Sequence, residues 1–242
     1  VERFIQIGVS KGNIKQVGSI KFDAILKKAN SSIRINNDSK YLLAASTHKG
    51  EEEIVIDSYC KLLEDFQNLK MILVPRHPER ASSVIEIFKK RKLSAKIISH
   101  LNIDTENADA FILNATGKLN ILYDHAEIAF IGGSLFKRYG GHTLIEPANN
   151  KCAIIVGPYM KNFEDIVNIF NDKNACIQLN SYKELSSAFK ELLNNNEYRI
   201  NMVDNASDVV AKNRGSTEIQ YKYIQEFVKH ETNNSNNKTL QS

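Results

Sequence analysis

Two short segments of the sequence place basic and imidazole side chains beside residues that restrict the backbone. In Pro75-Arg76-His77-Pro78 the Arg76 guanidinium offers a planar pair of N–H donors, and the prolines limit the entropy lost in holding it. In Ser46-Thr47-His48-Lys49-Gly50 the glycine permits a tight turn, and acidic residues follow where a helix dipole favours them. These side chains suit a phosphate or a carboxylate. Two structural alternatives stay open: a capped helix start at Thr47-His48, and a surface turn in which Arg76 pairs with a nearby acid.

Two further segments are rich in glycine. Gly132-Gly133-Ser134 is followed by Lys137-Arg138-Tyr139-Gly140-Gly141-His142-Thr143, and amide N–H groups at such turns form anion sites without any added cation. We expect a helix to begin near His142 and Glu146 to lie one turn into it, where its carboxylate would accept hydrogen bonds from hydroxyl groups or only favour the helix dipole. Thr116-Gly117-Lys118-Leu119 has the pattern of a turn from a strand to a helix, and its glycine would let a ligand approach the backbone.

All four segments follow short apolar runs that alternate with longer amphipathic ones. This alternation predicts an α/β fold with a Rossmann-like doubly wound parallel sheet. The predicted strands are Tyr41–Ser46, Met71–Pro75, Ala95–Ser99, Phe111–Asn114, Ile128–Ile131, Ala153–Val156 and Cys176–Leu179. The predicted helices are Glu51–Phe66, Glu79–Lys92, Lys118–His125, Lys161–Asn171, Ser181–Leu193 and Glu197–Lys212. Because ligands bind at the carboxyl ends of such strands, the four segments should meet at one edge of the sheet.

The composition limits the classes of function. Of the 242 residues, 42% are hydrophobic, which is enough for a buried core. The net charge is only +4 and basic residues form no long block, so we expect no nucleic-acid partner. The absence of a Walker loop and of the G-x-G-x-x-G pattern argues against a kinase, an ATPase or a dehydrogenase. We expect no cofactor and no metal, because no cluster has metal-ligand spacing, and the three widely spaced cysteines fit a reducing cytoplasm.

The sequence divides into three parts. Residues 1–40 combine a short apolar stretch with a polar segment, and we expect the end of an amino-terminal domain and a linker there. Residues 41–230 hold the predicted sheet domain. Residues 231–242 are almost wholly polar and rich in asparagine, which predicts a disordered tail. No apolar run approaches the roughly 20 residues that a membrane-spanning helix needs.

Taken in order, these motifs resemble those of the 3-deoxy-D-manno-octulosonic acid (Kdo) transferases of lipopolysaccharide synthesis, which are two-domain glycosyltransferases of the GT-B fold. The resemblance covers almost the whole chain. Its motifs are Gly18-Ser19-Ile20-Lys21-Phe22-Asp23, Ala45-Ser46-Thr47-His48-Lys49-Gly50-Glu51-Glu52, Val74-Pro75-Arg76-His77-Pro78-Glu79-Arg80, Gly117-Lys118-Leu119, Ala129-Phe130-Ile131-Gly132-Gly133-Ser134, Gly140-Gly141-His142, Glu146-Pro147-Ala148 and Gly157-Pro158. By this resemblance, the chain corresponds to the carboxy-terminal, donor-binding half of such an enzyme.

The resemblance implies an inverting transfer of Kdo from CMP-Kdo to a lipid A precursor at the cytoplasmic face of the bacterial inner membrane. It also implies which residues bind the donor: Thr47, His48, Pro75, Arg76, His77, Gly117, Leu119, Gly132, Gly133, Gly141, His142, Thr143 and Glu146.

Within this set the resemblance implies three roles. Arg76 and the amides of Gly132-Gly133 and Gly140-Gly141 would stabilise the departing cytidylate. Gly117 and Leu119 would approach the base or the ribose through their backbone. Glu146 would hold hydroxyl groups of the ribose or the sugar.

The chain departs from the family pattern in two ways. Thr143 stands where the family has asparagine, and a threonine cannot offer the amide pair of that side chain. The family's amino-terminal domain carries the acceptor groove, the membrane association and the glutamate general base, and it has no counterpart upstream of Val1. We therefore expect negligible turnover from this chain alone.

Two alternatives to this function remain. One is a GT-B glycosyltransferase that uses a nucleoside-diphosphate sugar, and nucleotide preference would separate it from a Kdo transferase. The other is a non-catalytic remnant or interaction module, which would bind no nucleotide.

Overall fold

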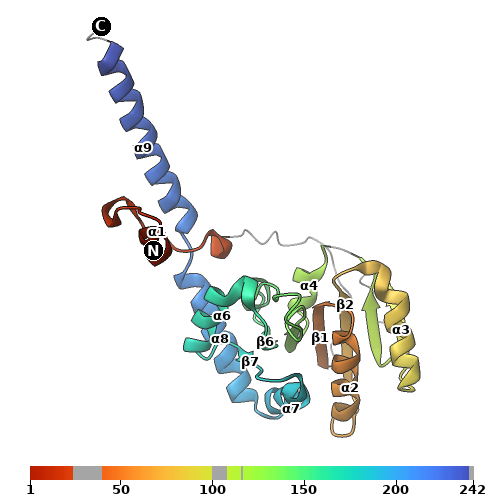
Figure 1. Cartoon of the computed structure of the whole chain (residues 1–242). Helices are drawn as coiled ribbons and strands as arrows, with labels where there is room; N and C mark the ends of the chain where they lie inside the picture. The colour runs from red at the N-terminus through yellow and green to blue at the C-terminus, as the bar shows by residue number, and fades with distance from the viewer. Residues whose placement is uncertain (24–39, 100–107, 116, 240–242) are drawn as a thin grey trace. The chain divides into compact units, whose positions relative to one another are not determined.

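The computed structural model describes residues 1–23, 40–99, 108–115 and 117–239, and describes side chains up to Lys229 (Figure 1). Contacts divide the chain into two compact units. One unit consists of Val1–Ile25 together with Val210–Ser242, and the other of Leu26–Val209. The second unit holds the sheet and every residue of the predicted donor site.

The described residues of the larger unit form a seven-stranded sheet in which every pair of neighbouring strands is parallel. Along the sheet the strand order is β3-β4-β2-β1-β5-β6-β7. The strands are β1 Lys40–Thr47, β2 Leu69–Pro75, β3 Ala95–Ile98, β4 Ala110–Leu113, β5 Ile128–Ile131, β6 Ala153–Val156 and β7 Ile177–Gln178. After β1, the chain forms β2, β3 and β4 on one side of β1, and then β5, β6 and β7 on the other side. This is the doubly wound topology that the sequence predicted.

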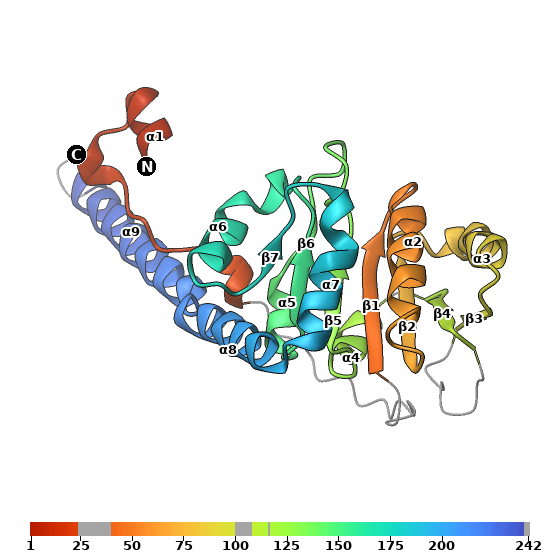
Figure 2. The ribbon, with the colours of Figure 1, turned by 90° about the horizontal axis from the view of Figure 1, so that it is seen from below.

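Helices lie on both sides of the sheet (Figure 2). The larger unit contains α2 Glu51–Leu63, α3 Ala81–Lys90, α4 Leu119–Tyr123, α5 Ile145–Asn149, α6 Glu164–Asp172 and α7 Leu185–Asn194, with short 3-10 turns η3 Pro78–Arg80, η4 Lys161–Phe163 and η5 Tyr182–Glu184. Helix α8, Asn196–Lys212, continues from this unit toward the carboxyl end. Apolar residues of α2, α3 and α7, among them Tyr59, Phe88 and Phe189, form one buried cluster with alternate residues of the strands. Helices α4 and α5 contact each other and pack against β1 and β6 respectively.

The predicted elements agree closely with this structure. Ile128–Ile131 and Ala153–Val156 have the predicted bounds, and the other five strands differ from the prediction by one or two residues at one end or at both. The predicted helices Glu79–Lys92, Lys161–Asn171 and Ser181–Leu193 each begin with a 3-10 turn before the α-helix. The prediction that a helix begins near His142 is wrong, because α5 begins at Ile145.

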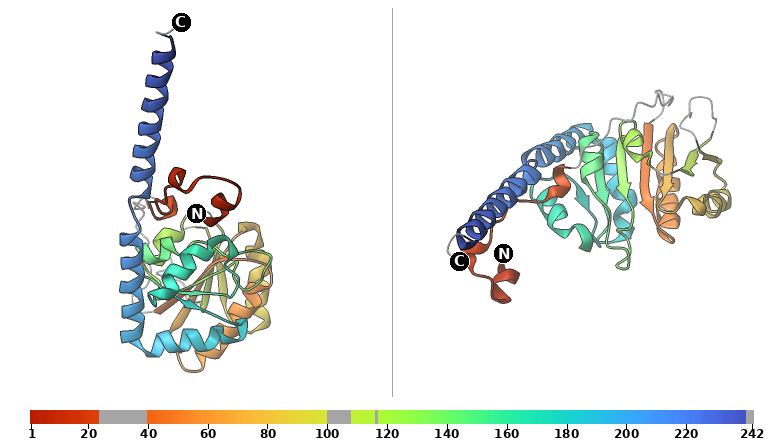
Figure 3. Two further views of the ribbon diagram at one scale, coloured as in Figure 1. Left: turned by 60° about the vertical axis from the view of Figure 1, so that its left-hand side comes forward. Right: turned by 90° about the horizontal axis from the view of Figure 1, so that it is seen from above.

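The smaller unit joins the start of the chain to its last helix. It contains α1 Glu2–Gln6, η1 Lys11–Asn13, η2 Ile20–Asp23 and α9 Ser216–Thr239 (Figure 3). The Asp23 carboxylate accepts hydrogen bonds from the backbone N–H groups of Gly215 and Thr217, each at 2.6 Å. A hydrogen bond from the Thr217 side chain, followed by these two backbone hydrogen bonds, lowers the pKa of Asp23. The carboxylate also satisfies donors at the start of α9 that have no partner within the helix. The motif that ends at Asp23 therefore anchors this helix.

The domain boundaries drawn from the sequence stay predictions. The division into two compact units falls at other positions in the sequence, after Ile25 and after Val209. Most of the predicted linker lies outside the described residues. Helix α9 continues to Thr239 and so enters the segment 231–242 for which we expected disorder. Its sequence after Gly215 has neither glycine nor proline to stop a helix. In the described part of the chain, no helix has the length and apolarity that a membrane span requires.

Candidate functional site

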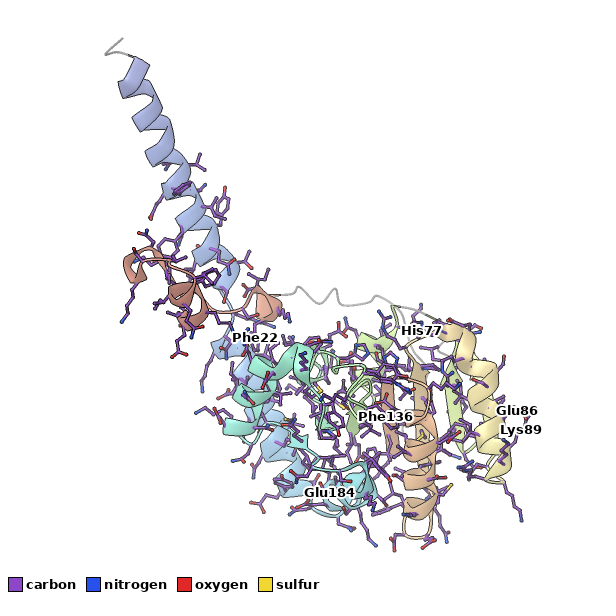
Figure 4. All side chains as sticks on the ribbon, viewed as in Figure 1. Phe22, His77, Glu86, Lys89, Phe136 and Glu184 are labelled. Atoms are coloured by element: carbon purple, nitrogen blue, oxygen red, sulfur yellow. The ribbon has the colours of Figure 1, made fainter. Side chains whose placement is uncertain are left out.

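Three of the four predicted donor-binding segments follow strands at the point where the direction of the sheet reverses. Strand β1 has β2 on one side and β5 on the other, and chain growth changes direction at β1. In such sheets the loops at the carboxyl ends of the strands diverge at this point and leave room for a ligand. The loops that follow β1, β2 and β5 carry Thr47-His48, Arg76-His77 and Gly132-Gly133. His77, labelled in Figure 4, lies where the chain leaves β2 before α3.

Strand β1 ends irregularly, which directs its last residues toward the neighbouring loops. Its register with β2 shifts between Ala45 and Thr47, and Ser46 has a φ of 54°. Thr47 is fully buried, and its carbonyl accepts the backbone N–H of Arg76 at 2.9 Å. Its hydroxyl oxygen has no hydrogen-bond partner among the described residues. Gly50, with a φ of 94°, turns the chain into α2.

Three histidines from three loops lie together. The Nε2 atoms of His48 and His142 are 3.1 Å apart, and their rings are nearly parallel with centroids at 5.4 Å. The ring of His77 meets that of His48 edge-on at 5.8 Å. Tyr139 stacks on His48 at 4.0 Å, and the Arg138 guanidinium lies 4.7 Å from the centre of the Tyr139 ring. The loop after β5 therefore supplies aromatic support for the histidine of β1.

Both histidines of the close pair are held in the neutral form near neutral pH. Burial lowers the pKa of His48 to about 4, and the nearby imidazoles of His142 and His77 and the guanidinium groups of Arg76 and Arg80 lower it further. Burial, followed by the charge of Arg76, also lowers the pKa of His142. In a neutral pair one Nε2–H donates to the other ring nitrogen, and the tautomers decide which outer nitrogen remains a donor. The pair can therefore bind oxygen atoms of a ligand without adding a full positive charge.

Arg76 and Arg80 differ in a way that the sequence did not indicate. The Arg80 Nε donates to Oε1 of the fully buried Glu52 at 3.1 Å, so Arg80 is part of the fold. Arg76 is exposed, and no acidic group pairs with its guanidinium among the described residues. The alternative of a surface turn with Arg76 bound to a local acid therefore finds no support in the described residues.

The amides of the glycine pairs do not serve as we expected. The N–H of Gly132 donates to the carbonyl of Ala45 at 2.8 Å, and that of Gly133 donates to Oε2 of Glu51 at 2.7 Å. The N–H of Gly141 donates to the carbonyl of Gly133 at 2.7 Å. These three donors are already satisfied within the protein, so they cannot also stabilise a departing nucleotide. This corrects the sequence-based assignment for these three glycines, whereas the N–H of Gly140 has no acceptor among the described residues.

Glu146 and Thr143 frame the short helix α5. The Thr143 hydroxyl oxygen accepts the N–H of Ile145 at 3.2 Å, so threonine caps this turn, as its hydroxyl allows. Glu146 is the second residue of α5, not one turn into a helix from His142. Its carboxylate is half-buried and has no hydrogen-bond or ion-pair partner in the described part of the chain. Burial raises the pKa of Glu146, which is the electrostatic cost of this unpaired position.

Gly117 follows β4, and Leu119 begins α4. Gly117 is exposed with a φ of 72°, and a β-carbon there would have no atom within 4 Å, so a ligand can approach its backbone. No hydrogen bond or ring contact among the described residues joins Gly117 or Leu119 to the histidine group. Thr116, from the same motif, lies outside the described residues. In the residues that are described, no group of three or more His, Cys, Asp or Glu side chains could hold a metal ion.

Sequence reasoning missed two residues that organise the site, Glu51 and Tyr139. Glu51 was interpreted only as an acid that favours a helix dipole, yet its carboxylate is fully buried and accepts hydrogen bonds from two loops. Tyr139 lies in a basic loop, and its stacking on His48 joins positions 91 residues apart. For Glu51, the signal in the sequence was the pair of acids Glu51-Glu52 at the start of a helix, a few residues after a strand. For Tyr139 there was no local signal.

The depressed pKa of His48 leads to a test of stability against pH. Between pH 6.5 and about 4 the unfolded chain binds more protons at this histidine than the folded chain does. Stability that is present above pH 6.5 is therefore lost as the pH falls through this window. We expect the free energy of unfolding, measured with urea, to fall more between pH 7.5 and pH 5 in the wild type than in His48→Asn. An equal fall in both proteins would contradict a histidine that is held neutral by the fold.

Comparison with known proteins agrees with the motifs. No protein-family model matches the chain. A 3-deoxy-D-manno-octulosonic acid transferase of Haemophilus influenzae is 34% identical over 222 residues, which are 89% of this chain and 52% of the relative. The corresponding transferase of Rickettsia prowazekii is 34% identical over 207 residues, which are 81% of this chain and 43% of the relative. The chain thus spans about half the length of these relatives.

A solved structure matches the fold as well as the sequence. The C-terminal CMP-Kdo binding domain of WaaA from Acinetobacter baumannii is 28% identical, with a TM-score of 0.64, and the match covers 71% of this chain and 89% of that domain. The chain is therefore a homologue of the Kdo transferases, with the GT-B fold of their carboxy-terminal domain.

Proposed function

We propose that this chain binds CMP-Kdo and holds it for an inverting transfer of Kdo to a lipid A precursor. The observation that carries the proposal is the exposed Arg76 guanidinium, which pairs with no acidic group among the described residues and whose charge acts on both His48 and His142, at the point where the sheet reverses direction. The 28% identical domain of Acinetobacter baumannii, which is described as binding CMP-Kdo, supports this choice of donor.

The reaction places negative charge on the nucleotide side of the site. A hydroxyl oxygen of the acceptor bonds to the anomeric carbon of Kdo, and the bond from that carbon to the phosphate oxygen breaks. The electron pair of that bond leaves with cytidylate. Groups that hold the phosphate more tightly as it gains charge accelerate this step. We assign that role to Arg76, whose fork can bond two phosphate oxygens at once, with an outer nitrogen of the histidine pair as a further donor.

The remaining contacts of the donor are hydroxyl groups and the base. The Glu146 carboxylate has no hydrogen-bond or ion-pair partner among the described residues, and hydroxyl groups of the ribose or the sugar can donate to it. The open backbone at Gly117 and the start of α4 at Leu119 are suited to the base or the ribose. Thr47, Pro75, His77, Thr143 and the glycines Gly132, Gly133 and Gly141 shape these loops around the ligand.

The acceptor side of the reaction is assigned to a part of the enzyme outside this chain. The transferases of Haemophilus influenzae and Rickettsia prowazekii are about twice as long as the matched segment. We place there the groove for the lipid A precursor, the general base that takes the hydroxyl proton and the association with the cytoplasmic face of the inner membrane. The chain alone should then bind the donor nucleotide without turning over.

Calorimetric titration of the chain with CMP, run beside UDP, tests this proposal. We expect saturable binding of CMP and at least tenfold weaker binding of UDP. Preference for UDP would instead support a glycosyltransferase that uses a nucleoside-diphosphate sugar. If neither nucleotide binds, the chain is a remnant and the proposed function is wrong.

A further inference from the structure

Glu51 joins the two loops that carry the close histidine pair. Its side chain is fully buried at the start of α2. Oε2 accepts the backbone N–H of His48 at 2.9 Å and that of Gly133 at 2.7 Å, and Oε1 accepts the N–H of Leu135 at 2.8 Å. One carboxylate therefore satisfies a donor of the loop after β1 and two donors of the loop after β5.

Gly133 extends this restraint to both imidazole rings. A β-carbon at Gly133 would lie 3.0 Å from Cδ2 of His142 and 3.5 Å from Cδ2 of His48, so both rings lie close against this glycine. The carbonyl of Gly133 also accepts the N–H of Gly141, the residue before His142. Glu51 therefore fixes the backbone of His48 directly and that of His142 through Gly133 and Gly141.

The burial of this carboxylate needs a reason beyond helix formation. Removing a carboxylate from water is costly, and burial raises the pKa of Glu51 although the amides of Leu135, Gly133 and His48 act against the rise. Glu53, in the same first turn of α2, is exposed and could serve the helix dipole without that cost. The buried position is explained by the three amides that only a carboxylate at this point can satisfy together.

We propose that Glu51 is a positioning residue for the donor site, which sets the spacing of His48 and His142 and thereby shapes the phosphate side of that site. The inference rests on the proposed function for its effect on nucleotide binding. It also explains why two amides of the loop after β5 do not face a ligand, because Glu51 accepts the N–H groups of Gly133 and Leu135. Phosphate recognition then depends on side chains that this carboxylate holds in place.

The test is a Glu51→Gln variant, studied by NMR of the histidine ring protons and by calorimetry with CMP. Glutamine has nearly the same volume, but its NH₂ group must face at least one of the three N–H donors. We expect the ring signals of His48 and His142 to shift in the free protein and the affinity for CMP to fall about tenfold, as expected for the loss of roughly 1.4 kcal/mol. Glu52→Gln is the matched control, because Glu52 is equally buried in the same turn but its carboxylate bonds Arg80 and none of these amides.

Each outcome separates this inference from the proposed function. If the wild type binds CMP and Glu51→Gln binds it equally well with unmoved ring signals, Glu51 has no positioning role. If the ring signals move but the wild type binds no CMP, the positioning holds and the proposed function is wrong.

If Glu51→Gln does not fold, an NMR titration of the wild type tests the inference instead. The amide protons of His48, Gly133 and Leu135 should change chemical shift together as one carboxyl group titrates, with a pKa above the usual range for glutamate. Independent titration of the three amides would overturn the inference.

Discussion

Arg76→Ala should weaken the binding of CMP by about 10- to 100-fold, because a charge-assisted hydrogen bond contributes roughly 1.5–3 kcal/mol. The guanidinium is exposed and has no acidic partner among the described residues, so its removal breaks no ion pair of the fold. Its backbone N–H, which bonds the carbonyl of Thr47, is kept in the variant. Thermal stability should therefore stay close to that of the wild type while the affinity falls in a calorimetric titration.

Two further variants define what Arg76 contributes. Arg76→Lys keeps the charge but loses the planar fork, so it should recover only part of the affinity. Arg91→Ala removes an arginine of the same unit, at the end of α3, that bonds Asp57 at 2.8 Å, and it should bind CMP like the wild type. Equal affinity in Arg76→Ala and the wild type would exclude Arg76 from the phosphate site.

Gly132→Ala should lower the stability of the sheet domain by about 3 kcal/mol, the upper part of the usual range for overpacking a buried site. The added β-carbon would lie 2.5 Å from the carbonyl oxygen of Ser46 and 2.7 Å from the α-carbon of Thr47. Both are backbone atoms, and the N–H of Gly132 bonds the carbonyl of Ala45, so neither strand can move away freely. In a domain of this size a loss of that order lowers the melting temperature by roughly 6–12 °C.

Gly12→Ala is the control for this substitution. A β-carbon at Gly12 would meet no atom within 4 Å, and its φ lies outside the positive range. The melting temperature of the Gly12→Ala variant should stay within about 2 °C of the wild type, since surface substitutions usually change stability by less than ~0.5 kcal/mol. A melting temperature of Gly132→Ala as high as that of Gly12→Ala would mean that β1 and β5 do not approach as closely as described.

The sheet could be predicted because buried parallel strands are nearly continuous apolar runs. Ile128–Ile131 lies between Glu127 and Gly132, and Ala153–Val156 is followed by Gly157, so the ends of these strands were evident. The last helix was not predicted, because the sequence from Ser216 onward is mostly polar and the apolar residues it has, such as Ile224 and Phe227, are exposed. The 3-10 turns before α3, α6 and α7 were also missed, since they depend on local backbone geometry rather than on periodicity.

The site could be predicted only as far as position along each strand determines it. His48, Arg76 and Gly132 directly follow strands, and the order of parallel strands brings their loops to one edge. The sequence did not indicate which backbone N–H groups are free to bind a ligand. The N–H of Gly133, for example, donates to the Glu51 carboxylate, which is 82 residues away in the sequence. The same limit applies to the stacking of Tyr139 on His48. Pairings between distant loops depend on packing that residue types alone do not specify.

The most direct test of the donor site is a crystal structure of this chain with bound CMP. We predict the phosphate within hydrogen-bond distance of the Arg76 guanidinium and beside the His48–His142 pair, with a ribose hydroxyl on Glu146. CMP bound away from the carboxyl ends of β1, β2 and β5 would contradict the assigned site, even if the nucleotide binds tightly.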